Sequence, residues 1–194
     1  MKFNRKILSL FTVLTLIVSV FTGFSVSANA ADFNPDNVEV YITSDKTTAN
    51  VGDVVTISVN VNGIQGAFGA GEGIVGVSAG LEYNTSVLEY VENSIKYNTT
   101  ASVISTVNPK MDANTITMLK SAGVFSAFDK AMRNDGWLVQ MKFKVLSKTP
   151  TTILLADGVM SDIGYNTFLT YVKDGKKSSI KKNLKIDQTP IKIN

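Results

Sequence analysis

Strict alternation of apolar and polar side chains is the feature that most constrains how this chain folds. From Val55 to Val61 every second residue is Val or Ile, and the residues between them are Thr, Ser or Asn. From Trp137 to Val145 large apolar side chains again occupy every second position, Trp137 included. A period of two places one face of a strand in a core and the other in water. The two segments therefore predict half-buried β-strands, and with them a protein built on sheets.

Shorter runs of the same kind recur along the chain, separated by turn signals rich in Asn, Asp, Gly and Pro. They occupy residues 38–43, 75–83, 95–97, 103–107, 115–120, 153–156, 167–172, 184–186 and 190–193. One segment is helical in pattern, because its apolar residues fall three or four positions apart from Val124 to Arg133. We expect an all-β fold, an antiparallel β-sandwich of about nine strands with one short helix between strands.

The first 30 residues have the pattern of a secretory signal peptide. Lys2, Arg5 and Lys6 precede an apolar run, and the segment ends in Ala28-Asn29-Ala30, a typical cleavage sequence. The apolar run is too short for a membrane-spanning helix. We expect residues 1–30 to be a signal peptide, 31–37 a polar N-terminal lead, and 38–194 a single domain. The expected location is extracellular or at the cell surface, with no membrane span after cleavage.

The composition favours binding over catalysis. The chain has no cysteine and no histidine, so thiolate nucleophiles, thiolate zinc sites and imidazole bases are excluded. Without residues 1–30, which carry three basic and no acidic side chains, the numbers of acidic and basic residues are equal. A neutral domain gives no reason to expect a nucleic-acid partner. We expect no enzyme activity and no cofactor.

One segment has the spacing of a calcium loop. Asp32, Asn34 and Asp36 stand at its first, third and fifth positions, but Pro35 interrupts the loop and no glutamate closes it. We therefore expect no metal site there.

Small residues line one side of the strand predicted at 75–83. The segment from Gly66 to Gly80 holds six glycines, and we interpret its first half as a mobile loop. In the strand that follows, Gly76, Ser78, Gly80 and Glu82 share one face. Such a flat face lets either a partner or a neighbouring loop of the same chain approach closely, and the sequence leaves both possibilities open.

Three segments in order resemble a known family. Residues 51–59 (VGDVVTISV), 81–91 (LEYNTSVLEYV) and 135–145 (DGWLVQMKFKV) are similar to the "GD-V-V-V", "YDPSVLEVV" and "DG-L-F-V" segments of cohesin domains, the dockerin-binding modules of cellulosome-type assemblies. The resemblance spans roughly residues 38–193, and the fold it implies is a nine-stranded sandwich of jelly-roll topology. Gly76 and Ser78 stand where type I cohesins carry an Asn-x-Asp pair, and Asn84 replaces an aspartate, so the cohesin type is left open.

The resemblance implies a secreted, non-catalytic module that binds a dockerin-bearing protein through one sheet face, in assemblies that degrade polysaccharide. The partner-binding residues expected on that face are Gly76, Ser78, Gly80, Glu82, Thr117 and Leu119. If the predicted helix and the glycine-rich loop frame the docking face, Gly80→Arg should abolish capture of the partner and leave thermal unfolding nearly unchanged, whereas a large loss of stability would mean that the face is buried.

Two other functions remain open. A carbohydrate-binding module on the same sandwich would present a planar row of exposed aromatic rings, for which Tyr41, Tyr90, Tyr97 and Tyr165 are the candidates. A glycosidase would need two carboxylates that converge in a deep cleft, and no pair in the sequence is placed to do so.

Overall fold

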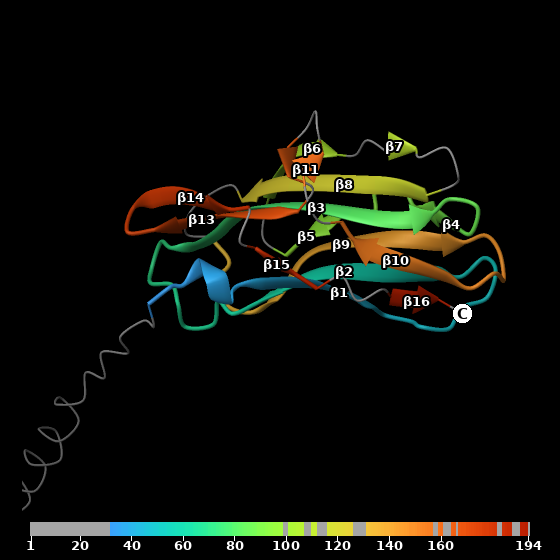
Figure 1. Ribbon diagram of the computed structural model, residues 1–194, viewed down its shortest axis with the longest axis horizontal. Helices are drawn as coiled ribbons and strands as arrows, with labels where there is room; N and C mark the ends of the chain where they lie inside the picture. The colour runs from blue at the N-terminus through green and yellow to red at the C-terminus, as the bar shows by residue number, and fades with distance from the viewer. Residues whose placement is uncertain are drawn as a thin grey trace, which may run out of the picture.

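The computed structural model is a sandwich of two β-sheets, called sheet A and sheet B below (Figure 1). It describes residues 32–98, 101–106, 110–111, 116–125, 131–156, 159–160, 164–165, 167–181, 184–187 and 191–193. The predicted signal peptide lies outside these ranges. Within them, no helix is long and apolar enough to cross a membrane.

Sheet A is formed by strands from both ends of the chain. Its order is β15 (Lys185–Ile186), β1 (Glu39–Ser44), β2 (Val54–Asn62), β9 (Gly136–Val145) and β4 (Leu88–Tyr90), and β5 (Lys96–Tyr97) also pairs with β9. The pairs are antiparallel except β1 with β15, which is parallel.

Sheet B is built around the long strand β3 (Gly73–Asn84). Its order is β14 (Lys176–Ile180), β13 (Phe168–Lys173), β3, β10 (Thr151–Leu155) and β16 (Ile191–Ile193). β13 and β10 pair with one edge of β3, and β8 (Ile116–Phe125) pairs with the other edge. β8 also pairs with β6 (Ala101–Thr106) and β7 (Lys110–Met111). Two further strands, β11 (Val159–Met160) and β12 (Gly164–Tyr165), pair with each other. Figure 1 shows β10 and β16 of sheet B lying across β2 and β1 of sheet A.

The core lies between the two sheets and is filled by the side chains that the alternation predicts. Val55, Ile57, Val59 and Val61 of β2 are fully buried, and so is Phe143 of β9. Sheet B adds Ala79 and Leu81 from β3, Ile153 from β10 and Leu169 from β13, among others. The prediction of an all-β sandwich is confirmed.

The alternation in β9 is broken at one point, where the sequence analysis is wrong. Val59 pairs with Val139 but Asn60 pairs with Trp137, so Leu138 is an extra residue that forms a bulge. Leu138 and Val139 are both fully buried, whereas Trp137 is half-buried. Because Trp137 is paired with Asn60, it lies on the outer face of sheet A and not with Val139 in the core.

The predicted helix at Val124–Arg133 is also wrong in the described part of that segment. Val124 and Phe125 belong to β8, where Val124 pairs with Gly76 of β3. At the other end Met132 forms a β-bridge with Ile74 through two backbone hydrogen bonds of 2.8 and 2.9 Å. Residues 126–130 lie outside the described residues. Long-range pairing with β3 outweighs the local helical spacing.

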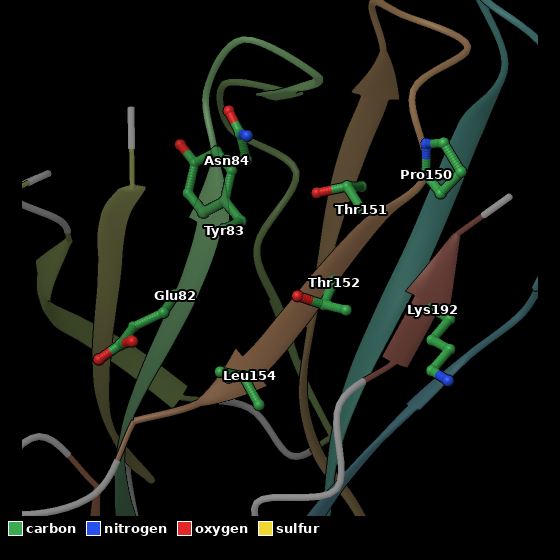
Figure 2. A pocket seen from close by; sticks show the side chains of 8 residues that line it. All are labelled: Glu82, Tyr83, Asn84, Pro150, Thr151, Thr152, Leu154 and Lys192. Carbon is green, nitrogen blue, oxygen red and sulfur yellow. The ribbon is translucent and has the colours of Figure 1, made fainter. Parts of the chain in front are cut away.

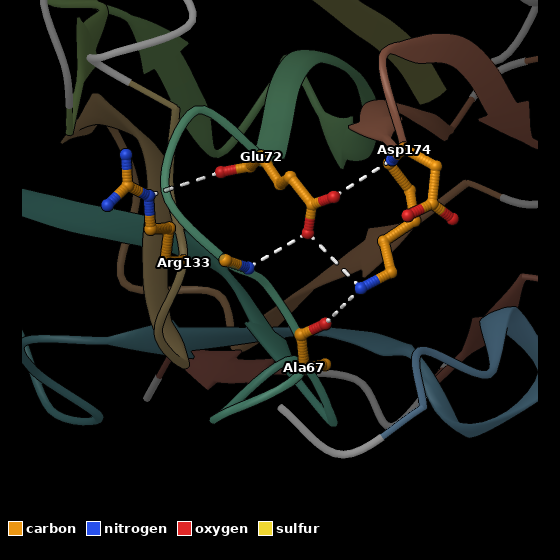
Figure 3. A network of polar contacts seen from close by, with 6 residues as sticks. Ala67, Glu72, Arg133 and Asp174 are labelled. Atoms are coloured by element: carbon orange, nitrogen blue, oxygen red, sulfur yellow. Dashed lines mark hydrogen bonds and ion pairs between the residues drawn. The ribbon is translucent and has the colours of Figure 1, made fainter. Parts of the chain in front are cut away.

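The glycine-rich loop before β3 is fastened at both sides, contrary to the expectation of a mobile loop (Figure 3). The Glu72 carboxylate accepts hydrogen bonds from the backbone N–H groups of Gly69 and Asp174, both at 2.8 Å, and pairs with Lys173 Nζ at 3.1 Å. The Asp174 and Gly69 N–H groups lower the pKa of Glu72 from 4.5 to about 2. The charged carboxylate thus ties the loop to the turn between β13 and β14.

An aromatic cluster holds the same loop from the other side. The Phe33 ring lies 4.5 Å from the Phe68 ring and 4.7 Å from the Tyr171 ring, measured between centroids. Phe68 belongs to the loop and is buried. Phe33 belongs to the segment predicted as a polar lead, which therefore contributes packing to the domain.

Candidate functional site

Gly80 lies at the centre of sheet B, at a junction where two strands pair with the same edge of β3, one after the other. The N-terminal half of β3 pairs with β13 and the C-terminal half with β10. At the junction Gly80 accepts from Ala156 N at 2.7 Å and donates to Thr167 Oγ1 at 3.3 Å, and Thr167 Oγ1 donates to the Ala156 carbonyl at 2.8 Å. A buried threonine hydroxyl thus continues the ladder where one strand ends and the next begins.

Three of the predicted partner-binding residues lie in this part of β3. Gly76, Ser78 and Gly80 are all buried in the chain by itself, and Ser78 has no exposed surface at all. These three residues are therefore not accessible to a partner that docks on the chain in this conformation. Of the four residues predicted on this strand face, Glu82 is the one that is only half-buried.

Thr117 and Leu119, the other two predicted partner-binding residues, belong to β8. Thr117 is in register with Tyr83 of β3 and Leu119 with Leu81, and the β8 position in register with Glu82 is Met118. That Thr117 and Leu119 contact a partner stays a prediction from the sequence.

Glu82 borders a hollow on sheet B, formed where β3, β10 and β16 lie side by side (Figure 2). The hollow has a volume of about 450 Å³ and is lined by Glu82, Tyr83, Asn84, Pro150, Thr151, Thr152, Leu154 and Lys192. In register, Leu154 is opposite Glu82, and Thr152 is opposite Lys192. Figure 2 shows these four side chains in sequence from β3 across β10 to β16.

The lining combines one acidic group, one basic group and a half-buried apolar side chain. Leu154 is half-buried like Glu82, whereas Thr152 and Lys192 are exposed. A carboxylate and an ammonium group separated by an apolar contact can select a partner by charge and bury its apolar side chains. We call this surface, defined by Glu82, Leu154, Thr152 and Lys192, the sheet B hollow.

Tyr83 has a structural role in this site and is not a reactive group. Its side chain is buried, and its ring packs edge-on against Phe143 with centroids 4.9 Å apart. Burial raises the pKa of the Tyr83 phenol above 10, with smaller contributions from Tyr90 and Glu89. The phenol is therefore neutral at physiological pH. Glu82 is the one carboxylate in the lining, so the hollow has no pair of the kind that glycosidases use.

The other candidates from the sequence have structural surroundings of their own. Asn34, from the calcium-like spacing, accepts a hydrogen bond from Asp36 N at 3.0 Å and caps the 3₁₀ turn η1 (Pro35–Asn37). In the described part of the chain, no three acidic side chains are grouped closely enough to hold a metal ion.

The tyrosines proposed as a carbohydrate-binding row do not share one face. Tyr90 and Tyr97 pack against the core, whereas Tyr41 lies on the outer face of sheet A. The side chain of Tyr165 lies outside the described residues.

Sequence reasoning missed three of the four residues of the sheet B hollow. Leu154 and Thr152 fall in a short apolar run, and Lys192 in a run after a proline. Both runs are recognisable as strands, but β10 is placed beside β3 by pairing across about 70 residues of sequence, and β16 is placed beside β10 by pairing across about 40. No local signal in the sequence specifies that pairing.

The sequence and fold were compared with those of known proteins. The sequence pattern of the family described as "Cohesin domain" matches residues 38–186. No curated protein matches the chain.

Among solved structures, a type II cohesin domain from the cellulosome of Acetivibrio cellulolyticus is similar, with a TM-score of 0.54 and 23% identity, over 81% of this chain and 95% of that one. The second type II cohesin module of the ScaA scaffoldin of the same organism aligns with a TM-score of 0.55 and 20% identity, over 80% of this chain and 96% of that one. A type II cohesin–X-dockerin complex from that organism gives a TM-score of 0.52 and 19% identity, over 81% of this chain and 99% of that one.

The family match covers most of the residues that form both sheets, from the start of β1 to the end of β15. The structural matches place the same two-sheet fold in experimentally determined cohesins. This chain belongs to the cohesin domain family.

Proposed function

We propose that this chain is a dockerin-binding module and that the sheet B hollow is part of its docking surface. Cohesin domains are non-catalytic modules for protein–protein interaction. A solved complex of similar fold pairs a type II cohesin with an X-dockerin partner. The observation that carries the proposal is the family match over residues 38–186.

The placement of the docking surface rests on Glu82 and its neighbours. Among the predicted partner-binding residues of β3, Glu82 is the one that is only half-buried, and the hollow beside it is open to solvent. The hollow adjoins a rigid sheet, in which β3 has neighbours along both edges. A rigid surface loses little conformational entropy on binding, which favours affinity. Gly76, Ser78 and Gly80 precede Glu82 on the same strand, where they are buried.

Secretion is part of the same proposal. The basic, apolar and small-residue segments of residues 1–30 support export and cleavage after Ala30. The domain then acts outside the cell, either free or at the cell surface, where a secreted dockerin-bearing protein meets it. Cellulosomal cohesins provide the precedent for such a location.

Capture from the secreted proteins of the source organism tests this function. Residues 31–194 are immobilised, and bound proteins are identified by mass spectrometry. We expect the retained proteins to carry dockerin sequences. Retention of no dockerin-bearing protein from a fraction that contains them would overturn the proposal.

Charge reversal at Glu82 then tests the site with one captured dockerin. Glu82→Lys should weaken binding about tenfold or more, because it places a like charge near Lys192 and removes the acidic group from the surface. Glu89→Lys is the matched control, since Glu89 is an exposed carboxylate on β4 of the opposite sheet. Equal affinity of the two variants, measured by calorimetry, would place the docking surface elsewhere.

A further inference from the structure

The outer face of sheet A carries a polar lattice that is fixed by hydrogen bonds between strands. Asn60 Nδ2 donates to Thr43 Oγ1 at 3.1 Å, and Gln140 Nε2 donates to Ser58 Oγ at 3.0 Å. These bonds link β1, β2 and β9 in the middle of the sheet. Side chains held in this way offer hydrogen-bonding groups to a ligand without a further loss of rotamer entropy.

Two aromatic rings flank this lattice in register. Tyr41 of β1 pairs with Asn60 of β2, and Asn60 pairs with Trp137 of β9. The bulge at Leu138 is what places Trp137 on this face, and its carbonyl is held by Asn98 Nδ2 at 2.7 Å. Adjacent strands are about 4.8 Å apart, so the backbones at Tyr41 and Trp137 are separated by about 10 Å.

The row Tyr41–Asn60–Trp137 has hydrogen-bonding capacity that the described residues do not use. Asn60 is 9% exposed, and its Nδ2 donates hydrogen bonds to Thr43 Oγ1 and to the Ser58 carbonyl, at 3.1 Å each. The Asn60 Oδ1 accepts no hydrogen bond from the described residues. Among the same residues, the Trp137 indole N–H and the Tyr41 hydroxyl also have no hydrogen-bond partner. Because Asn60 is largely buried, its unpaired Oδ1 is costly unless a ligand or water pairs with it, whereas Tyr41 and Trp137 are half-buried.

We infer that this row is a binding site for a chain of β-1,4-linked pyranose sugars. Aromatic rings stack on the apolar faces of pyranose rings, while amide and hydroxyl groups bond to the sugar hydroxyls. In an extended β-1,4 chain every second ring presents the same face, and a two-sugar unit has nearly the length of the Tyr41–Trp137 separation. Two aromatic rings with the Asn60 amide between them in register supply both kinds of contact that such a ligand needs.

This site is independent of the proposed dockerin surface. Tyr41 and Trp137 belong to sheet A, and the sheet B hollow lies on β3, β10 and β16. The two ligands can therefore occupy one chain at the same time, which would hold a dockerin-bearing protein next to polysaccharide.

Tryptophan fluorescence tests the inference directly, because Trp137 is the one tryptophan in the sequence. The mature domain, residues 31–194, is titrated with cellohexaose, a soluble chain of β-1,4-linked glucose. We expect a saturable change in emission. Tyr41→Ala, which keeps the reporter, should weaken the apparent affinity about tenfold. Leu146→Ala, which removes an exposed apolar side chain just after the end of β9, should not change it.

Calorimetry with Trp137→Ala provides the second measurement and does not depend on fluorescence. We expect no detectable heat of cellohexaose binding from this variant, while dockerin binding stays at the wild-type level. Absence of cellohexaose binding by the wild-type domain would overturn the inference. Equal sugar affinity of wild type and Tyr41→Ala, or loss of dockerin binding together with sugar binding in both variants, would overturn it as well.

Discussion

At the scale of single residues, burial decides what each predicted site position can do. Gly80 was selected from the sequence because a strand face of small residues admits a partner. In the structure the small size of Gly80 allows close packing within the chain itself, because Gly80 is buried at the junction with Thr167 and Ala156. A strand face of small residues fits a docking site and close packing within the chain equally well, and only the tertiary structure distinguishes the two.

Gly80→Arg is accordingly expected to destabilise the fold, contrary to the expectation from the sequence. A long charged side chain has to be accommodated at a buried position, which costs more than about 3 kcal/mol. Urea unfolding of the variant measures the loss. Thr152→Arg is the control, because Thr152 is exposed on the neighbouring strand β10 and should change stability by less than about 1 kcal/mol. Equal midpoints for Gly80→Arg and wild type would show that position 80 is accessible.

At the scale of elements, the alternation predicts strands well and their partners poorly. β2 and β9 were correctly expected because seven or more residues follow a period of two. The bulge in β9 could not be predicted, since Leu138 and Val139 are both apolar and either one fits the core. The spacing of apolar residues at the C-terminal end of β8 fits a helix as well as a strand, and pairing with β3 decides for the strand.

The site follows the same rule. Glu82 was found because it lies on a long strand whose pattern is plain. Thr152, Leu154 and Lys192 were missed because β10 and β16 are short and reach β3 through distant pairing. Trp137 was placed in the core by its spacing, although the bulge turns it to the outer face. The information that defines both surfaces therefore lies in register, which is a property of the assembled sheets.

The glycine-rich loop gives a prediction for pH dependence at this scale. The folded state lowers the pKa of Glu72 from 4.5 to about 2, so the carboxylate stabilises the fold when it is charged in both states. That contribution is fully present above about pH 4.5 and declines as the pH falls toward 2. Glu72→Gln should therefore unfold at lower urea concentration than wild type at pH 7, and the difference should shrink between pH 4.5 and 2.

Glu92→Gln serves as the comparison for Glu72, because Glu92 is an exposed turn residue that forms no ion pair within the described residues. Its unfolding midpoint should follow wild type at each pH. If the difference between Glu72→Gln and wild type were the same at pH 7 and near pH 2, the loop would not depend on the charge of Glu72.

At the scale of the whole molecule, the two sheets give the domain two outer faces with different chemistry. The sheet B hollow combines opposite charges with Leu154, and sheet A presents the Asn60 amide between two aromatic rings. The all-β architecture and a binding role were predictable from alternation, composition and resemblance, whereas the two surfaces proposed here for ligands could be located only from the pairing of the strands.

The most direct test of the central claim is NMR mapping of the domain with its captured dockerin. Amide chemical shifts of residues 31–194 are recorded with and without the partner. We predict that the largest changes fall at Glu82–Asn84, Thr151–Leu155 and Ile191–Ile193, with the strands β1 and β2 of sheet A little affected. Changes centred on β1 and β2, with none around Glu82, would contradict the account.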